Sequence, residues 1–182
     1  MNKKIFISTG EVSGDLHGSL LSKALFNEAK RKSIDLEICG LGGERMKREG
    51  VKIFQDTTSI SAIGIWEALP LIIPTIKIQK KFYKFLKKSS PNCLILIDYM
   101  GANIKLGKKL KSSKTRIPIY YYIAPQEWAW RVGNNSTTNL INFSDKIFAI
   151  FKQEEIFYKK MGGNVSWVGH PMIDLTRKLP SK

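Results

Sequence analysis

The sequence of 182 residues is poor in cysteine and histidine and has no long apolar run. Its two cysteines, Cys39 and Cys93, each lie in an apolar stretch typical of a buried strand, which indicates core residues of a reduced cytosolic chain and not a secreted disulfide framework. The longest apolar candidates, residues 69–76 and 93–97, fall far short of the roughly 18 residues that a membrane-spanning helix needs. Cysteines and histidines are isolated from one another, so no metal site is indicated.

Acidic residues are half as numerous as basic ones, 15 against 30, and the formal net charge is +15. This excess favours a polyanionic partner, which could be nucleic acid, an anionic membrane surface or a phosphorylated substrate. A lysine-rich solvated surface without such a partner explains the charge equally well. Since neither a nucleic-acid-binding motif nor a clustered basic helix is present, nucleic acid is not the expected partner, and a basic RNA-binding module remains the weaker alternative.

Short apolar runs alternate with amphipathic stretches along the chain. Leu16, Leu20 and Ala24 share one stripe of a predicted helix, the spacing of a face packed on a sheet. The alternation predicts an α/β fold, a doubly wound parallel sheet of Rossmann-like type over residues 1–175, followed by the start of a connection at 176–182. Strands are expected at residues 4–9, 36–41, 93–98, 118–123, 146–150 and 165–168, and helices at 16–31, 74–88, 103–111 and 153–161.

Two glycine-containing loops follow the first two predicted strands, and ligands of such sheets bind at the carboxyl ends of the strands. Glycine allows close approach of a ligand, and a helix amino terminus offers free amides to phosphate or sugar hydroxyls. The spacing matches neither the dinucleotide fingerprint nor a Walker A motif, and Ser13 or Asp15 could instead cap a helix. The candidate substrate-binding residues of these loops are Gly10, Glu11, Ser13, Gly14 and Asp15 in the first and Gly42 and Gly43 in the second.

Asp98 comes directly after a buried strand, so it is expected at the ligand edge of the sheet. Burial would raise its pKa and suit it to act as a general base, although a strand-end aspartate is as often a cap or an ion-pair partner. Asn103 is expected to cap the next helix and is also a candidate substrate-binding residue. Further along the chain, His170 is more often structural than catalytic in such a position.

Aromatic and polar side chains follow the predicted strand at residues 118–123. Gln126, Trp128 and Arg131 are candidates for stacking on a sugar or base and for pairing with phosphate. Core packing by the tryptophans is the alternative, but it leaves Gln126 and Arg131 unexplained.

The segment at residues 60–78 carries more apolar surface than one amphipathic face needs, and two prolines prevent a single regular helix there. With lysines downstream, it suits either the interface of an anionic membrane or a groove for acyl chains. A buried pair of helices is the alternative. The candidate contacts are Ile63, Ile65, Trp66, Leu69, Ile72 and Ile73.

Six motifs, taken in order, closely resemble the lipid-A-disaccharide synthase family, and the resemblance runs over nearly the whole chain. The motifs are residues 10–15 (GEVSGD), 40–43 (GLGG) with Met46, 63–65 (IGI) with Glu67, Ile97-Asp98, Pro125 with 128–131 (WAWR), and 168–171 (VGHP).

The resemblance implies the amino-terminal half of an inverting glycosyltransferase of GT-B type, with two Rossmann-like domains. Such an enzyme moves 2,3-diacylglucosamine from its UDP carrier to 2,3-diacylglucosamine 1-phosphate in lipid A biosynthesis, without a metal or organic cofactor. Asp98 matches the aspartate implicated as the base, and the segment around residues 63–73 matches the membrane-contacting region. A cytoplasmic protein peripherally bound to the inner face of the cytoplasmic membrane is therefore implied.

Two departures from the family bear on activity. Gly101 replaces the second aspartate of the family's IDAPDFN motif, and the chain stops where the family continues into a UDP-binding domain. We therefore expect the chain alone to be inactive, with a homodimer or a separate carboxyl-terminal half as partner. The alternative within the enzymes is half of another UDP-sugar transferase or epimerase of GT-B fold.

Overall fold

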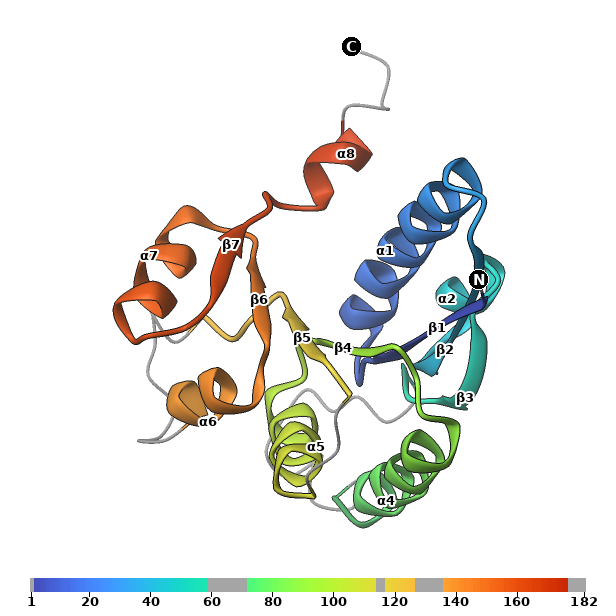
Figure 1. The fold of residues 1–182 in the computed structure, drawn as a ribbon, viewed down its shortest axis with the longest axis horizontal. Helices are drawn as coiled ribbons and strands as arrows, with labels where there is room; N and C mark the ends of the chain where they lie inside the picture. Colours follow the sequence, from blue (N-terminus) through green and yellow to red (C-terminus); the bar gives the residue numbers. More distant parts are fainter. Residues whose placement is uncertain (1, 59–71, 114–116, 127–135, 177–182) are drawn as a thin grey trace.

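The computed structural model describes residues 2–58, 72–113, 117–126 and 136–176, which form one seven-stranded parallel sheet with flanking helices (Figure 1). The strand order is β3-β2-β1-β4-β5-β6-β7, so the chain runs outward from β1 in one direction and from β4 in the other. This order confirms the doubly wound α/β fold. The strands are β1 (Asn2–Ser8), β2 (Asp35–Gly42), β3 (Lys52–Asp56), β4 (Cys93–Ile97), β5 (Ile119–Tyr122), β6 (Lys146–Ala149) and β7 (Val165–Trp167).

Helices lie on both faces of the sheet, as a parallel sheet requires. The helices are α1 (Val12–Arg31), α2 (Glu44–Arg48), α4 (Ile72–Ser89), α5 (Met100–Ser112), α6 (Ser136–Phe143), α7 (Lys152–Lys160) and α8 (Met172–Thr176). Figure 1 shows α1 on the opposite side of the sheet from α4, α5 and α6. None of the helices within the described ranges is long and apolar enough to cross a membrane.

Alternate residues of the central strands supply two separate cores. Phe6, Leu94 and Leu96 face the core that contains side chains of α4, α5 and α6. Ile7 and Ile95 face the core on the α1 side of the sheet. Both faces of β4 are buried, as the sequence predicted from its uninterrupted apolar run.

The elements that the sequence did not predict carry little apolar surface. Strand β3 lies at the edge of the sheet and has only Ile53 and Phe54 as partly buried apolar residues. Helix α6 buries only three side chains, and α8 buries none. All four predicted helices begin earlier than expected, and the difference is largest for the helices that begin at Val12 and at Met100.

Gly40 has no room for a side chain in the middle of the sheet. It lies on β2 opposite Ile7 of β1, and an added Cβ would lie 2.0 Å from the carbonyl oxygen of Ile7. We expect Gly40→Ala to lower the free energy of unfolding by about 3 kcal/mol, since backbone must move to make space. The midpoint of urea unfolding of the chain measures this change.

Gly101→Ala is the matched control for Gly40→Ala. Gly101 lies in the first turn of α5, and an added Cβ would meet no atom within 4 Å. Alanine costs less backbone entropy than glycine in a helix, so this variant is expected to gain about 0.5–1 kcal/mol. Equal midpoints for the two variants would contradict the packing described for β1 and β2.

Candidate functional site

Three loops singled out in the sequence emerge side by side at the carboxyl edge of the sheet. They follow β2, β1 and β4, which are consecutive in the strand order, and they contain residues 43–46, 9–15 and 98–103. Threonine hydroxyls join the loop after β1 to strand β2 and to the segment that follows β3. Thr9 Oγ1 donates to the carbonyl oxygen of Leu41 at 3.2 Å, and Thr57 Oγ1 donates to that of Thr9 at 3.1 Å. Side-chain hydrogen bonds therefore join neighbouring strand ends at this edge of the sheet.

Asp15 caps a helix, but the helix is α2 and not its own α1. One carboxylate oxygen accepts hydrogen bonds from the backbone N–H groups of Gly43 (2.7 Å) and Met46 (3.1 Å), and the other accepts one from Arg45 (3.0 Å). The side chain is only 3% exposed. Of the two interpretations left open by the sequence, capping is the one that the structure shows, and contact of Asp15 with substrate stays a prediction.

The glycines of these loops make room for protein side chains. A Cβ on Gly10 would lie within 2.0–2.3 Å of ring atoms of Tyr99, and a Cβ on Gly43 would lie 3.0 Å from the Asp15 carboxylate. Gly42 is similarly close to the sulfur atom of Met46. The close approach predicted at these glycines is therefore an approach of neighbouring loops, and their contact with substrate stays a prediction.

Asp98 lies at the end of β4 with an unusual backbone. Its φ is 46° and that of Tyr99 is 50°, in the left-handed region that costs an L-residue about 1 kcal/mol or more. Burial raises the pKa of the Asp98 carboxyl, while a hydrogen bond from the Tyr99 backbone and the charge of His17 act in the opposite direction. A half-buried carboxylate of raised pKa at this edge has the properties expected of a general base.

Asn103 lies in the first turn of α5 and is completely buried. Its amide nitrogen donates to the carbonyl oxygens of Asp98 (2.8 Å), Ile97 (3.1 Å) and Ser8 (3.2 Å). Its amide oxygen accepts the hydroxyl of Ser8 at 2.8 Å. The residue thus joins the ends of β1 and β4 instead of capping a helix by its side chain, and contact with substrate stays a prediction.

Two further titratable groups lie near Asp98. Partial burial, and then the charge of Asp98, raise the pKa of Glu11. Burial, and then the neighbouring His170, lower the pKa of His17, while Asp98 opposes this. The rings of His17 and His170 meet edge to face with centroids 6.3 Å apart. His170 Nδ1 also accepts the backbone N–H of Met172 at 3.2 Å.

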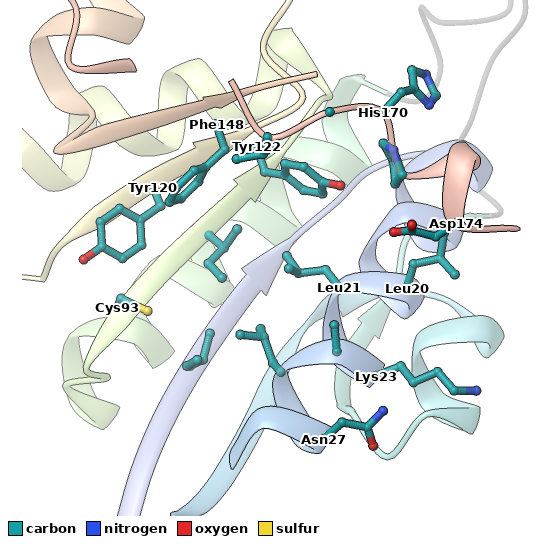
Figure 2. Close-up of a pocket in the computed structure, with 17 residues that line it drawn as sticks. Leu20, Leu21, Lys23, Asn27, Cys93, Tyr120, Tyr122, Phe148, His170 and Asp174 are labelled. Carbon is teal, nitrogen blue, oxygen red and sulfur yellow. The ribbon is translucent and has the colours of Figure 1, made fainter. Parts of the chain in front are cut away.

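An apolar groove of about 830 Å³ runs along the α1 face of β4, β5 and β6 (Figure 2). Tyr120, Tyr122 and Phe148 line its floor, and His170 and Asp174 lie at one end. Burial, and then the charge of Asp174, raise the pKa of Tyr122 to about 12. Cys93 also lines the groove, so only Cys39 of the two cysteines is the fully buried core residue expected from the sequence.

The remaining predicted contacts divide between described and undescribed residues. Gln126 is exposed beyond the end of β5, Glu11 directly precedes α1, and Ser13 is exposed in the first turn of α1. Ile72 and Ile73 begin α4. Outside the described residues lie Ile63, Ile65, Trp66, Leu69, Trp128 and Arg131.

The described residues contain no group of three or more histidine, cysteine, aspartate or glutamate side chains that could hold a metal ion. Sequence reasoning did not single out Ser8, His17 or Tyr121, although all three lie at this edge or point toward it. The signal for Tyr121 was its position in a run of three tyrosines, in which alternate residues face opposite sides of the sheet.

Solved structures of low sequence identity share this fold. S. aureus MnaA, in a co-structure with UDP, has a TM-score of 0.67 at 16% identity over 96% of this chain and 46% of that chain. A UDP-GlcNAc 2-epimerase from Neisseria meningitidis bound to UDP-GlcNAc has a TM-score of 0.60 at 13% identity, over 97% and 50%. At such identities the likeness concerns the fold alone.

Curated relatives are much more similar in sequence. A lipid-A-disaccharide synthase of Prochlorococcus marinus (strain MIT 9313) is 52% identical over 98% of this chain and 46% of its own length. One of Gloeothece citriformis (strain PCC 7424) is 46% identical over 98% and 47%. The chain thus spans about half the length of these relatives. A family model described as lipid-A-disaccharide synthetase matches residues 5–182, and the chain therefore belongs to the lipid-A-disaccharide synthase family.

Proposed function

We propose that this chain forms the acceptor side of a lipid-A-disaccharide synthase, with residues 1–175 as its domain and 176–182 as the start of a connection. The reaction would transfer 2,3-diacylglucosamine from UDP to 2,3-diacylglucosamine 1-phosphate. The observation that carries the proposal is the position of Asp98, whose half-buried carboxyl of raised pKa lies at the carboxyl edge of a central strand. Family membership supports the choice of reaction.

In this reaction Asp98 acts as the general base. Its carboxylate takes the proton of the acceptor's 6-hydroxyl as that oxygen bonds to the anomeric carbon of the donor. The bond from this carbon to the UDP oxygen breaks on the opposite side, so the configuration inverts and a β-1,6 disaccharide forms. Burial raises the pKa of Asp98 and thereby makes its carboxylate a stronger base.

In our proposal, the UDP-linked donor is bound by residues that do not belong to the 182 residues of this chain. The relatives are about twice as long, and the additional half would bind UDP and neutralise the leaving diphosphate. That half would be supplied by a continuation of the polypeptide, by a separate chain or by a homodimer. No metal or organic cofactor takes part in the proposed reaction.

We also propose that the chain binds the inner face of the cytoplasmic membrane as a peripheral protein through residues 63–73. Helix α4, which follows this segment, exposes Lys77, Lys80, Lys81 and Lys84, and Ile76 is 40% exposed beside them. Exposed lysines next to apolar residues favour an anionic interface. Acylated substrates are embedded in such an interface.

The second candidate is another UDP-sugar transferase or epimerase, which the shared fold with UDP-sugar enzymes favours. Such an enzyme would act on sugars without acyl chains and has no need of the apolar segment at residues 63–73. Comparing turnover with acylated and plain UDP-sugars separates the two candidates.

The role of Asp98 can be tested in a two-domain protein, made by joining this chain to the second half of the Prochlorococcus marinus relative. We expect Asp98→Asn to lower turnover by at least about a hundredfold, because the base is lost. Product is measured with acylated donor and acceptor. Asp35→Asn, an exposed carboxylate at the start of β2, is the control and should retain full turnover. Near-normal turnover of Asp98→Asn would remove Asp98 from this role.

The pH dependence of the two-domain protein follows from the same group. Asp98 accepts a proton only when ionised, and its pKa is raised above the ordinary value of 3.8. We therefore expect kcat/KM to fall as the pH decreases through this raised pKa. The fall should occur at a higher pH than it would with a solvent-exposed aspartate as the base. Rates measured between acid and neutral pH report this limb. If the residual activity of Asp98→Asn shows the same decrease of kcat/KM at low pH, this decrease reports the titration of another group.

Membrane contact can be tested with vesicles that contain anionic lipid. We expect Trp66→Ser combined with Ile72→Ser to weaken binding by about tenfold or more, because apolar area at the interface is lost. Co-sedimentation with the vesicles measures this change. Ile156→Ser with Met161→Ser removes exposed apolar side chains from the region of α7 and serves as the control. Equal binding of both double variants would exclude residues 63–73 as the contact.

A further inference from the structure

The left-handed backbone at Asp98 and Tyr99 must be held by its surroundings. Two consecutive non-glycine residues at φ 46° and 50° are unfavourable in a free chain. The side chain of Asp98 leaves the backbone at this point, so its direction depends on the orientation of the peptide group between Asp98 and Tyr99. Whatever fixes this peptide group also fixes where the carboxylate points.

Two buried side chains bind the carbonyl oxygen of this peptide group. The hydroxyl of Tyr121 donates to the Asp98 carbonyl oxygen at 2.7 Å, and the amide nitrogen of Asn103 donates to it at 2.8 Å. A carbonyl oxygen has two lone pairs, so these bonds fill its capacity. Both donors are completely buried, and they approach from different elements, β5 and α5.

Asn103 is itself fixed on its other sides. Its amide nitrogen also reaches the carbonyl oxygens of Ile97 and Ser8, and its amide oxygen accepts the Ser8 hydroxyl. Ser8 is the last residue of β1 and is completely buried. The Asp98 peptide is therefore tied to the ends of three neighbouring strands, β1, β4 and β5.

We infer that Asn103 and Tyr121 are positioning residues that hold the Asp98 carboxylate in its reactive direction by binding the Asp98 carbonyl oxygen. This inference rests on the proposed role of Asp98 as base. Neither side chain is exposed, so we expect both to act through Asp98, and this positioning role replaces the substrate contact predicted for Asn103 from the sequence. A displacement of a reacting group by about 1 Å is enough to lower the rate about a hundredfold. Fixing the direction of the Asp98 carboxylate therefore outweighs the conformational cost of the left-handed backbone.

Tyr121→Phe removes one of the two hydrogen bonds and leaves the ring in place. In the two-domain protein we expect it to lower kcat by about tenfold, with KM for the acceptor unchanged within about twofold, because orientation of the base matters in the transition state. Tyr158→Phe is the matched control. Its hydroxyl is equally buried and donates to the carbonyl oxygen of Pro125 at 2.7 Å, so it loses a similar bond elsewhere.

The combination with Asp98→Asn separates positioning from a general structural effect. If Tyr121 acts through the Asp98 carboxylate, Tyr121→Phe should cause no further loss of turnover in an Asp98→Asn background. A structural effect would lower the residual turnover by the same factor in both backgrounds. Asn103→Ala should behave like Tyr121→Phe with a larger loss of kcat, but Tyr121→Phe decides the test even where Asn103→Ala does not fold.

Three outcomes lead to different conclusions. A kcat loss of Tyr121→Phe that exceeds that of Tyr158→Phe and disappears in the Asp98→Asn background supports the inference. A loss no larger than that of Tyr158→Phe, or one that persists in this background, overturns it. Normal turnover of Asp98→Asn alone overturns the proposed function and the inference together, so the two failures are distinguishable.

Discussion

All seven strands run in the same direction, and the organisation of the candidate site depends on this constraint. Every loop that follows a strand emerges at one edge, and the strand order brings those after β2, β1 and β4 next to each other. Backbone groups at the ends of these strands lack partners in the sheet, and buried polar groups without partners are costly. Asp15, Asn103 and the threonine hydroxyls bind backbone groups at or just beyond the strand ends, so the edge forms a platform held by hydrogen bonds around Asp98.

The residues of this platform show why motif residues need not be ligand contacts. Asp15 belongs to a motif shared with the family, yet its carboxylate binds three backbone amides of the neighbouring loop. Gly10 lies beneath the ring of Tyr99, and Asn103 binds the carbonyl groups around Asp98. The contacts of these residues with neighbouring loops thus set the shape of the edge around Asp98.

Much of the fold could be predicted from the sequence, because periodicity reports burial directly. The apolar run in β4 led to the correct sheet, and the position of Asp98 at a strand end followed from it. The stripe of Leu16, Leu20 and Ala24 indicated a helix correctly but not its packed face. Helix α1 buries mainly small and polar residues, whereas Leu20 and Ala24 line the groove and Ala24 is exposed. Strand β3 and helix α6 escaped prediction since they bury few apolar side chains. The partners of Asp15, Asn103 and Tyr121 could not be predicted either, because those hydrogen bonds join residues that are distant in sequence and depend on the register of neighbouring strands.

The apolar groove beside α1 has a consequence for the stability of the chain against degradation in a cell. Tyrosine and phenylalanine side chains on the floor of an open groove present the kind of surface that molecular chaperones hold and that quality-control proteases sample. Coverage of the groove would then govern how long a newly made chain persists. Abundance in the cell would respond to whatever molecule fills the groove, even where that molecule takes no part in the chemistry proposed at Asp98.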